Sequence, residues 1–227
     1  FMKKNTLRLV RPERLLDKLK EITVTGFSTF FIDVAMGILT ILFNRQIMIY
    51  LGTNALAVYG VIVNISTFVQ CCSYSVGQAS QPIISTNFGA GKGDRIRETL
   101  KYAFFSLFWT ALSMLMPNVF IRYFMAPTAG VLKIAPSIFR CYGLSFLLLP
   151  LNIFSTYYFQ ALMKPRVAFI ASVARGLVIS GILIYLLPAT FGGNAIWFAM
   201  PITEAAVAFY VVHEMVKYTK QLSTREV

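Results

Sequence analysis

The sequence predicts an all-α membrane protein, a polytopic bundle of six transmembrane helices. Of its 227 residues, 57% are hydrophobic and only 13% are charged, and the mean hydropathy is +0.67. These values exclude a soluble domain, because one aqueous core cannot bury so much apolar surface. The apolar residues also gather in stretches of about 20 or more, the length that crosses a bilayer as a helix.

The apolar stretches define the predicted elements in order. Residues 1–22 are predicted to form a basic, amphipathic cytoplasmic linker, residues 23–217 the transmembrane lobe, and residues 218–227 a cytoplasmic tail. Within the lobe, the predicted spans cover residues 25–51, 55–87, 97–125, 131–162, 166–190 and 194–217. Connections as short as Gly52-Thr53-Asn54 predict that neighbouring spans pack as antiparallel hairpins.

The lysines and arginines determine how the chain is expected to lie in the membrane. The formal net charge is +12, and the basic residues gather before the first predicted span and after the second, fourth and sixth. The intervening connections are almost uncharged. This alternation follows the positive-inside rule, so we expect a multi-pass protein of the cell membrane with both ends of this sequence in the cytoplasm. Membrane lipid is its expected surrounding, and nucleic acid is not an expected partner.

No pattern in the sequence predicts enzymatic chemistry, a cofactor or a metal site. The glycine-rich run Gly89–Asp94 lacks the spacing of a phosphate-binding loop. His213 is the only histidine and has no second candidate ligand nearby in the sequence. The cysteines Cys71, Cys72 and Cys141 lie in apolar stretches and are interpreted as small packing residues.

The second predicted span carries a polar stripe along one side of its helix. The stripe residues recur at helical spacing: Asn64, Thr67, Tyr74, Gln78, Gln81 and Ser85. Because lipid cannot satisfy such groups, the stripe is expected to face other helices or water. Two interpretations remain open: hydrogen bonding between packed helices, or the lining of a solvated substrate cavity.

Ionisable residues within the spans are few, and each is predicted to be a buried charge: Asp33, Arg140, Arg175 and Glu204. Asp33 and Arg175 lie at similar predicted depths, which allows them to pair, and Glu204 is the alternative partner of Arg175. The functional interpretation of Asp33 is a carboxylate that exchanges a proton or Na⁺ when the cavity changes access. For Arg140, anchoring of its helix is the simpler interpretation.

Two runs of residues resemble a known family. One is Gly77-Gln78-Ala79-Ser80-Gln81-Pro82 through Asn87-Phe88-Gly89-Ala90-Gly91-Lys92, followed by Arg95 and Arg97. The other is Tyr158-Phe159-Gln160-Ala161-Leu162-Met163-Lys164-Pro165-Arg166. Together with the order of the spans, they resemble the carboxy-terminal lobe of the multidrug and toxic compound extrusion (MATE) family, preceded by its interlobe linker. The resemblance covers essentially the whole chain.

The resemblance implies a transporter with two six-helix lobes around a central cavity. It would export drugs or small organic metabolites in exchange for Na⁺ or H⁺, and the amino-terminal lobe of the same transporter would be the partner of this one. Some members of the family place a cation site in this lobe, with an acid in its first span and another in its fourth. Asp33 lies about one turn from the first position, and neutral Asn152 occupies the second. Coupling is therefore expected at Asp33 with Asn152, or in the other lobe.

Two other functions remain as alternatives. A flippase for lipid-linked sugar precursors would need several cationic side chains in its cavity to hold a pyrophosphate. A membrane scaffold without transport activity would keep the polar stripe packed and dry.

Overall fold

The computed structural model describes residues 14–113 and 129–224, and every element in those ranges is a helix. In chain order the helices are α1 (Leu15–Tyr50), α2 (Gly52–Gly89), α3 (Gly93–Ser113), α5 (Ala129–Gly143), α6 (Ser145–Ala161), α7 (Pro165–Val173), the π-helical turn η2 (Ala174–Val178), α8 (Ile179–Phe191), the 3₁₀ helix η3 (Gly193–Phe198) and α9 (Ala199–Thr224). The later part of the third predicted span, and the predicted connection that follows it, lie outside the described residues.

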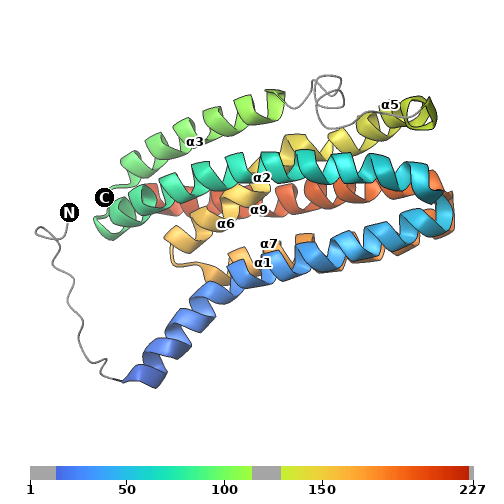
Figure 1. The fold of residues 1–227 in the computed structure, drawn as a ribbon. Helices are drawn as coiled ribbons and strands as arrows, with labels where there is room; N and C mark the ends of the chain where they lie inside the picture. Colours follow the sequence, from blue (N-terminus) through green and yellow to red (C-terminus); the bar gives the residue numbers. More distant parts are fainter. Residues whose placement is uncertain (1–13, 114–128, 225–227) are drawn as a thin grey trace, which may run out of the picture.

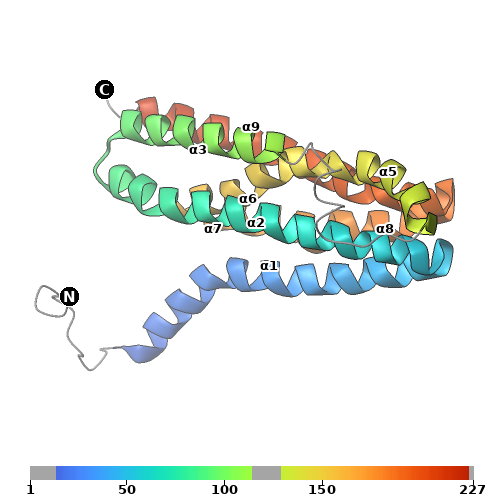
Figure 2. The same ribbon diagram turned by 45° about the horizontal axis from the view of Figure 1, so that its top comes forward.

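The predicted all-α membrane bundle is confirmed. Within the described residues, four stretches are long and apolar enough to cross a membrane: Gly52–Gly89, Lys133–Ala161, Pro165–Phe191 and Gly193–Lys220. The second part of α1 adds a shorter apolar stretch, Val34–Tyr50. The long helices lie roughly side by side, and the first turns of α1 lead away from the bundle (Figures 1 and 2).

The connection of the α1–α2 hairpin is very short, because Leu51 alone separates the two helices. Gly52 allows this turn, since its φ of +77° is one that a residue with a side chain rarely adopts. The turn between α8 and η3 packs against this hairpin, where a Cβ atom on Gly193 would lie 3.0 Å from Tyr50 Cβ. The antiparallel hairpins predicted from the short connections are therefore present.

The buried apolar residues form two clusters along the length of the bundle. The first apolar cluster lies toward the α1–α2 turn and includes Phe43, Tyr59, Tyr142 and Trp197. The second lies toward the end of α9 and includes Phe154, Tyr158, Phe159, Val211 and Met215. At that end the Tyr158 hydroxyl lies 2.8 Å from the Thr219 hydroxyl, a hydrogen bond that ties α6 to α9.

Candidate functional site: a buried polar layer and a polar helix face

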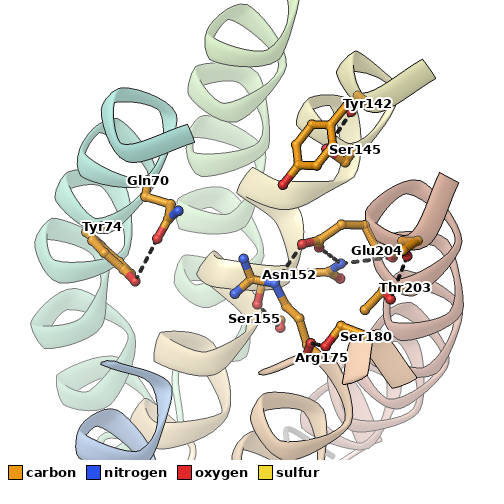
Figure 3. A network of polar contacts seen from close by, with 11 residues as sticks. Gln70, Tyr74, Tyr142, Ser145, Asn152, Ser155, Arg175, Ser180, Thr203 and Glu204 are labelled. Carbon is orange, nitrogen blue, oxygen red and sulfur yellow. Dashed lines mark hydrogen bonds and ion pairs between the residues drawn. The ribbon is translucent and has the colours of Figure 1, made fainter. Parts of the chain in front are cut away.

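A layer of polar side chains lies between the two apolar clusters. Its centre is Glu204 of α9, which stands along the helix between Met200 of the first cluster and Val207 of the second. The Glu204 side chain is completely buried, and Arg175 and Asn152 are buried beside it. Figure 3 shows these three side chains converging from α9, η2 and α6.

The hydrogen bonds of the layer connect all three helical segments. Arg175 Nε donates to Glu204 Oε1 at 2.8 Å, which makes a buried ion pair. The Asn152 amide donates through Nδ2 to Glu204 Oε2 at 2.6 Å and to the Glu204 backbone carbonyl at 2.9 Å. Both carboxylate oxygens are therefore bound, as a buried carboxylate requires. We call Asn152, Arg175 and Glu204 the polar layer.

Two atoms of the polar layer remain without a hydrogen-bond partner among the described residues. They are the acceptor Asn152 Oδ1 and the donor Arg175 Nη2, and both are buried. A buried polar atom without a partner carries a desolvation cost of about 1–3 kcal/mol. Asn152 Oδ1 can accept a hydrogen bond and Arg175 Nη2 can donate one, so each can bind a water molecule or a polar group of a bound compound.

The π-helical turn η2 sets the position of Arg175. A π turn contains one more residue than an α turn and shifts the side chains that follow, and such turns are frequent at functional sites. The Ser180 hydroxyl donates to the Arg175 carbonyl at 2.8 Å, five residues back along the chain. Next to the arginine, Gly176 lies against α1, where a Cβ atom would come within 2.9 Å of Ala35 Cβ. Close packing of α1 thus accompanies the shifted turn.

The second feature is the outer face of α2. Polar residues on this helix are exposed at the surface of the lobe: Asn64, Thr67, Cys71, Ser75, Gln78 and Ser85. We call them the polar face of α2. Its hydroxyl groups bond to the helix itself, for example Thr67 to the Val63 carbonyl at 2.9 Å. The amides of Asn64 and Gln78 make no hydrogen bond to the described part of the chain and are free to bind other groups.

Other helices expose a different kind of surface. The large exposed side chains of α9 include Ile202, Phe209, Val212 and Val216, and those of α3 include Tyr102, Phe104, Phe105 and Phe108. These surfaces suit lipid, whereas the polar face of α2 does not. The described lobe therefore has a lipid-compatible side and a side that needs water or protein.

The MatE family model matches residues 27–186, more than half of the chain. The chain belongs to the MatE family. This is the multidrug and toxic compound extrusion family that the sequence resembles, and the chain is a multi-pass membrane protein. No curated protein sequence matches the chain.

Solved MATE structures share the fold of this lobe. An outward-facing multidrug resistance MATE transporter of the MOP superfamily is 19% identical, with a TM-score of 0.79 over 96% of this chain and 50% of that chain. An inward-facing one is 19% identical, with a TM-score of 0.76 over 99% of this chain and 54% of that chain. A MOP superfamily transporter from Pyrococcus furiosus, whose binding pocket has reverse polarity, is 18% identical, with a TM-score of 0.81 over 96% of this chain and 50% of that chain. This MatE chain spans about half the length of these structures.

The structure brings together some of the predicted site residues of this MatE lobe. Glu204 is paired with Arg175, and Asn152 binds the same carboxylate. Asp33 lies in α1, and its side chain is outside the described residues. Arg140 is exposed at the surface of the described lobe, which favours the helix-anchoring interpretation over that of a buried charge. Its helix ends at Gly143, close enough to the arginine for the long side chain to reach the surface.

In the described lobe, the residues of the predicted stripe on α2 differ in their exposure. Asn64, Thr67 and Gln78 are exposed on the polar face, whereas Tyr74 and Gln81 are half-buried at its margin. The Tyr74 hydroxyl lies 3.5 Å from Gln70 Oε1 on the same helix.

Sequence reasoning missed two members of the polar face. Cys71, interpreted as a packing residue, is exposed, and Ser75 is exposed one turn later. Thr67, Cys71 and Ser75 are each four residues apart, and this spacing could have placed all three on the same face of the helix. Within the described residues, no group of three or more histidine, cysteine, aspartate or glutamate side chains is placed to hold a metal ion.

Proposed function

We propose that this chain is one lobe of a secondary active transporter that exports drugs or small organic metabolites in exchange for Na⁺ or H⁺. The polar face of α2 is the observation that carries the proposal. A membrane helix with exposed amide, hydroxyl and thiol groups over its length is costly against lipid, so this face is expected to border a water-filled passage. Asn64 and Gln78 would then offer amide groups to a passing compound.

A second lobe completes the proposed passage. The solved relatives are about twice as long as this chain. An amino-terminal lobe opposite the polar face of α2 would enclose the cavity between the two, and rocking of one lobe against the other would open it to alternate sides. The plasma membrane is the proposed location, with both ends of this chain in the cytoplasm, from the distribution of basic residues.

The proposed coupling residue is Asp33, with Asn152 as a neutral partner. The polar layer already balances its own charges, since Glu204 faces Arg175 and Asn152 is neutral. It therefore needs no additional cation, and Asp33 is the other carboxylate that lies away from the ends of the predicted spans. Ala35, two residues along α1 from Asp33, packs against Gly176 of the turn that carries Arg175. Binding and release of a cation at Asp33 are thus proposed to alter the contact between α1 and the turn that carries Arg175.

The flippase alternative has less support from the positions of the cations. Arg175 is neutralised by Glu204, and α2 contains no lysine or arginine in its whole length. A pyrophosphate group would find no cation on the polar face of α2, whereas an uncharged or cationic organic compound would not need one.

The proposal is tested with the intact protein in proteoliposomes, with ethidium as a fluorescent cationic probe. We expect an imposed H⁺ or Na⁺ gradient to drive ethidium against its concentration gradient, and an ionophore for that cation to abolish the movement. The Asp33→Asn variant should lose gradient-driven movement, whereas Asp17→Asn, which removes an exposed acid at the start of the same helix, should keep it. Failure of both gradients to drive ethidium would contradict the proposal, and full activity of Asp33→Asn would remove that residue from the coupling.

A further inference from the structure

Two apolar grooves run along the lipid-compatible side of the lobe, one on each side of α9. The first lies between α6 and α9, has a volume of about 740 Å³ and is lined by apolar residues that include Leu148, Leu151 and Phe209. The second lies between α3 and α9, has a volume of about 380 Å³ and includes Leu100, Phe104 and Met215. Figure 2 shows α3 and α9 side by side.

The two grooves share one ridge of α9. Val212, Val216 and Lys220 line both of them. These residues are spaced by four, so they follow one another along a single line of the helix. The grooves are therefore parallel channels that flank the valines and meet at Lys220.

The first groove is about as long as one leaflet of a membrane is deep. On α9 its lining runs from Ala205 to Val216, with His213 as the one polar residue in that run, and Lys217 and Lys220 follow. Eleven steps of 1.5 Å give about 16 Å along the helix. Half of a bilayer's hydrocarbon core is about 15 Å. This mainly apolar part of the first groove thus has the depth of one layer of acyl chains.

Basic side chains gather where the grooves meet. Lys217 and Lys220 line the first groove, Arg97 and Lys220 line the second, and no acidic residue lines either. Arg97 and Lys217 each have a carboxylate neighbour outside the grooves, Asp94 at 3.4 Å and Glu214 at 3.9 Å. Such exposed or long ion pairs are weak, so a phosphate group can compete for these cations.

We propose that this surface binds one anionic diacyl phospholipid. Its two acyl chains lie in the two grooves, on either side of the ridge of Val212 and Val216, and its phosphate contacts Arg97, Lys217 and Lys220. Two apolar channels with one basic end match a molecule with two chains and one charged head, and basic pockets between membrane helices are a common form of lipid site. The site does not depend on the proposed transport function.

The test measures thermal unfolding of the intact protein in detergent, with added dioleoylphosphatidylglycerol. We expect the midpoint to rise by roughly 5 °C at lipid concentrations about 100-fold above Kd. Dioleoylphosphatidylcholine and glycerol 1-phosphate should produce no such rise. The groove variant Arg97→Gln/Lys217→Gln/Lys220→Gln should lose the effect. The control variant Lys92→Gln/Arg95→Gln/Arg166→Gln removes the same charge from exposed positions outside the grooves and should keep it.

A second variant tests the acyl-chain part of the site without changing any charge. Val216 lines both grooves, so the larger side chain of Val216→Trp occupies the space of the acyl chains. This variant should also abolish the phosphatidylglycerol effect, and it tests the site even if the triple groove variant does not fold. Equal loss in the groove and control variants would overturn the proposal in favour of unspecific attraction. An equal response to glycerol 1-phosphate would overturn it in favour of a phosphate site, and an unchanged response in Val216→Trp would exclude the grooves.

Discussion

Arg175 and Glu204 form an ion pair inside the lobe, with Arg175 Nε 2.8 Å from Glu204 Oε1. The glutamate is fully buried, and the arginine side chain is only 9% exposed. A buried pair of this kind contributes little net stability, because desolvation of the two ions offsets their attraction. Removal of one partner is different, since it leaves the other charge buried and uncompensated.

The Glu204→Gln variant is therefore expected to lose about 3–5 kcal/mol of stability. The double variant Arg175→Gln/Glu204→Gln should regain part of that loss, because no charge remains. Thermal unfolding of the intact protein in detergent measures both effects. Asp94→Asn, which breaks an exposed ion pair, is the control and should cost less than about 1 kcal/mol. A single variant as stable as the wild type would show that the pair is not needed to balance charge.

Replacement of Asn152 by Asp should make stability depend on pH. The amide nitrogen of Asn152 donates to two oxygens of Glu204. An ionised aspartate side chain at position 152 has no hydrogen to donate, so its oxygens would lie against these two acceptor oxygens and repel them. The repulsion is present when the introduced carboxyl group is ionised and is relieved when it binds a proton. The unfolding midpoint of Asn152→Asp should thus approach the wild-type value as the pH falls.

Asn152→Ala is the matched control for that experiment. It loses the same hydrogen bonds but introduces no titrating group, so its deficit relative to the wild type should be constant from about pH 8 to about pH 5. A deficit of Asn152→Asp that stays equally constant would contradict the placement of Asn152 beside the Glu204 carboxylate.

The contact between η2 and α1 predicts the effect of a single methyl group. Gly176→Ala places a Cβ atom within 2.9 Å of Ala35 Cβ and should destabilise the protein by about 1–3 kcal/mol. Gly181→Ala, in the next helix, meets nothing within 4 Å and should be tolerated. The reciprocal variant Gly176→Ala/Ala35→Gly should recover stability beyond the sum of the single effects. Thermal unfolding of the wild type, the single variants Gly176→Ala, Ala35→Gly and Gly181→Ala, and the double variant provides the measurement. An unchanged midpoint for Gly176→Ala would mean that the helices do not pack this closely.

The order and approximate limits of the helices followed from the sequence. The second span was predicted over residues 55–87 and is observed as α2 over Gly52–Gly89, since its length, apolar content and bounding glycines are local properties. The fourth was predicted over 131–162 and corresponds to α5 and α6, which are separated at Leu144. The polar stripe on α2 was also predictable, because helical periodicity alone defines it.

The details of the polar layer were not predictable, because they depend on contacts between distant segments. The sequence offered Asp33 and Glu204 as possible partners of Arg175, and the pairing with Glu204 depends on the packing of α9 against η2. The π turn was not predicted from the sequence, and Gly176 within it lies close to Ala35 of α1. The exposure of Cys71 was misjudged for a related reason: an apolar span does not reveal which of its faces lies outside the lobe.

The polar face of α2 is proposed to border water rather than lipid or packed protein, and thiol labelling distinguishes these surroundings. Cys71 is exposed on this face, and the variant Cys72→Ser/Cys141→Ser leaves it as the only cysteine among those present in this chain. Phe209→Cys, added to a background without Cys71, is the control, because position 209 is 81% exposed on the apolar surface of α9. In proteoliposomes, a membrane-impermeant methanethiosulfonate reagent should label Cys71 at a rate that changes with an imposed cation gradient, and should not label position 209. Cys71 that remains unlabelled under every gradient would contradict a water-filled passage along α2.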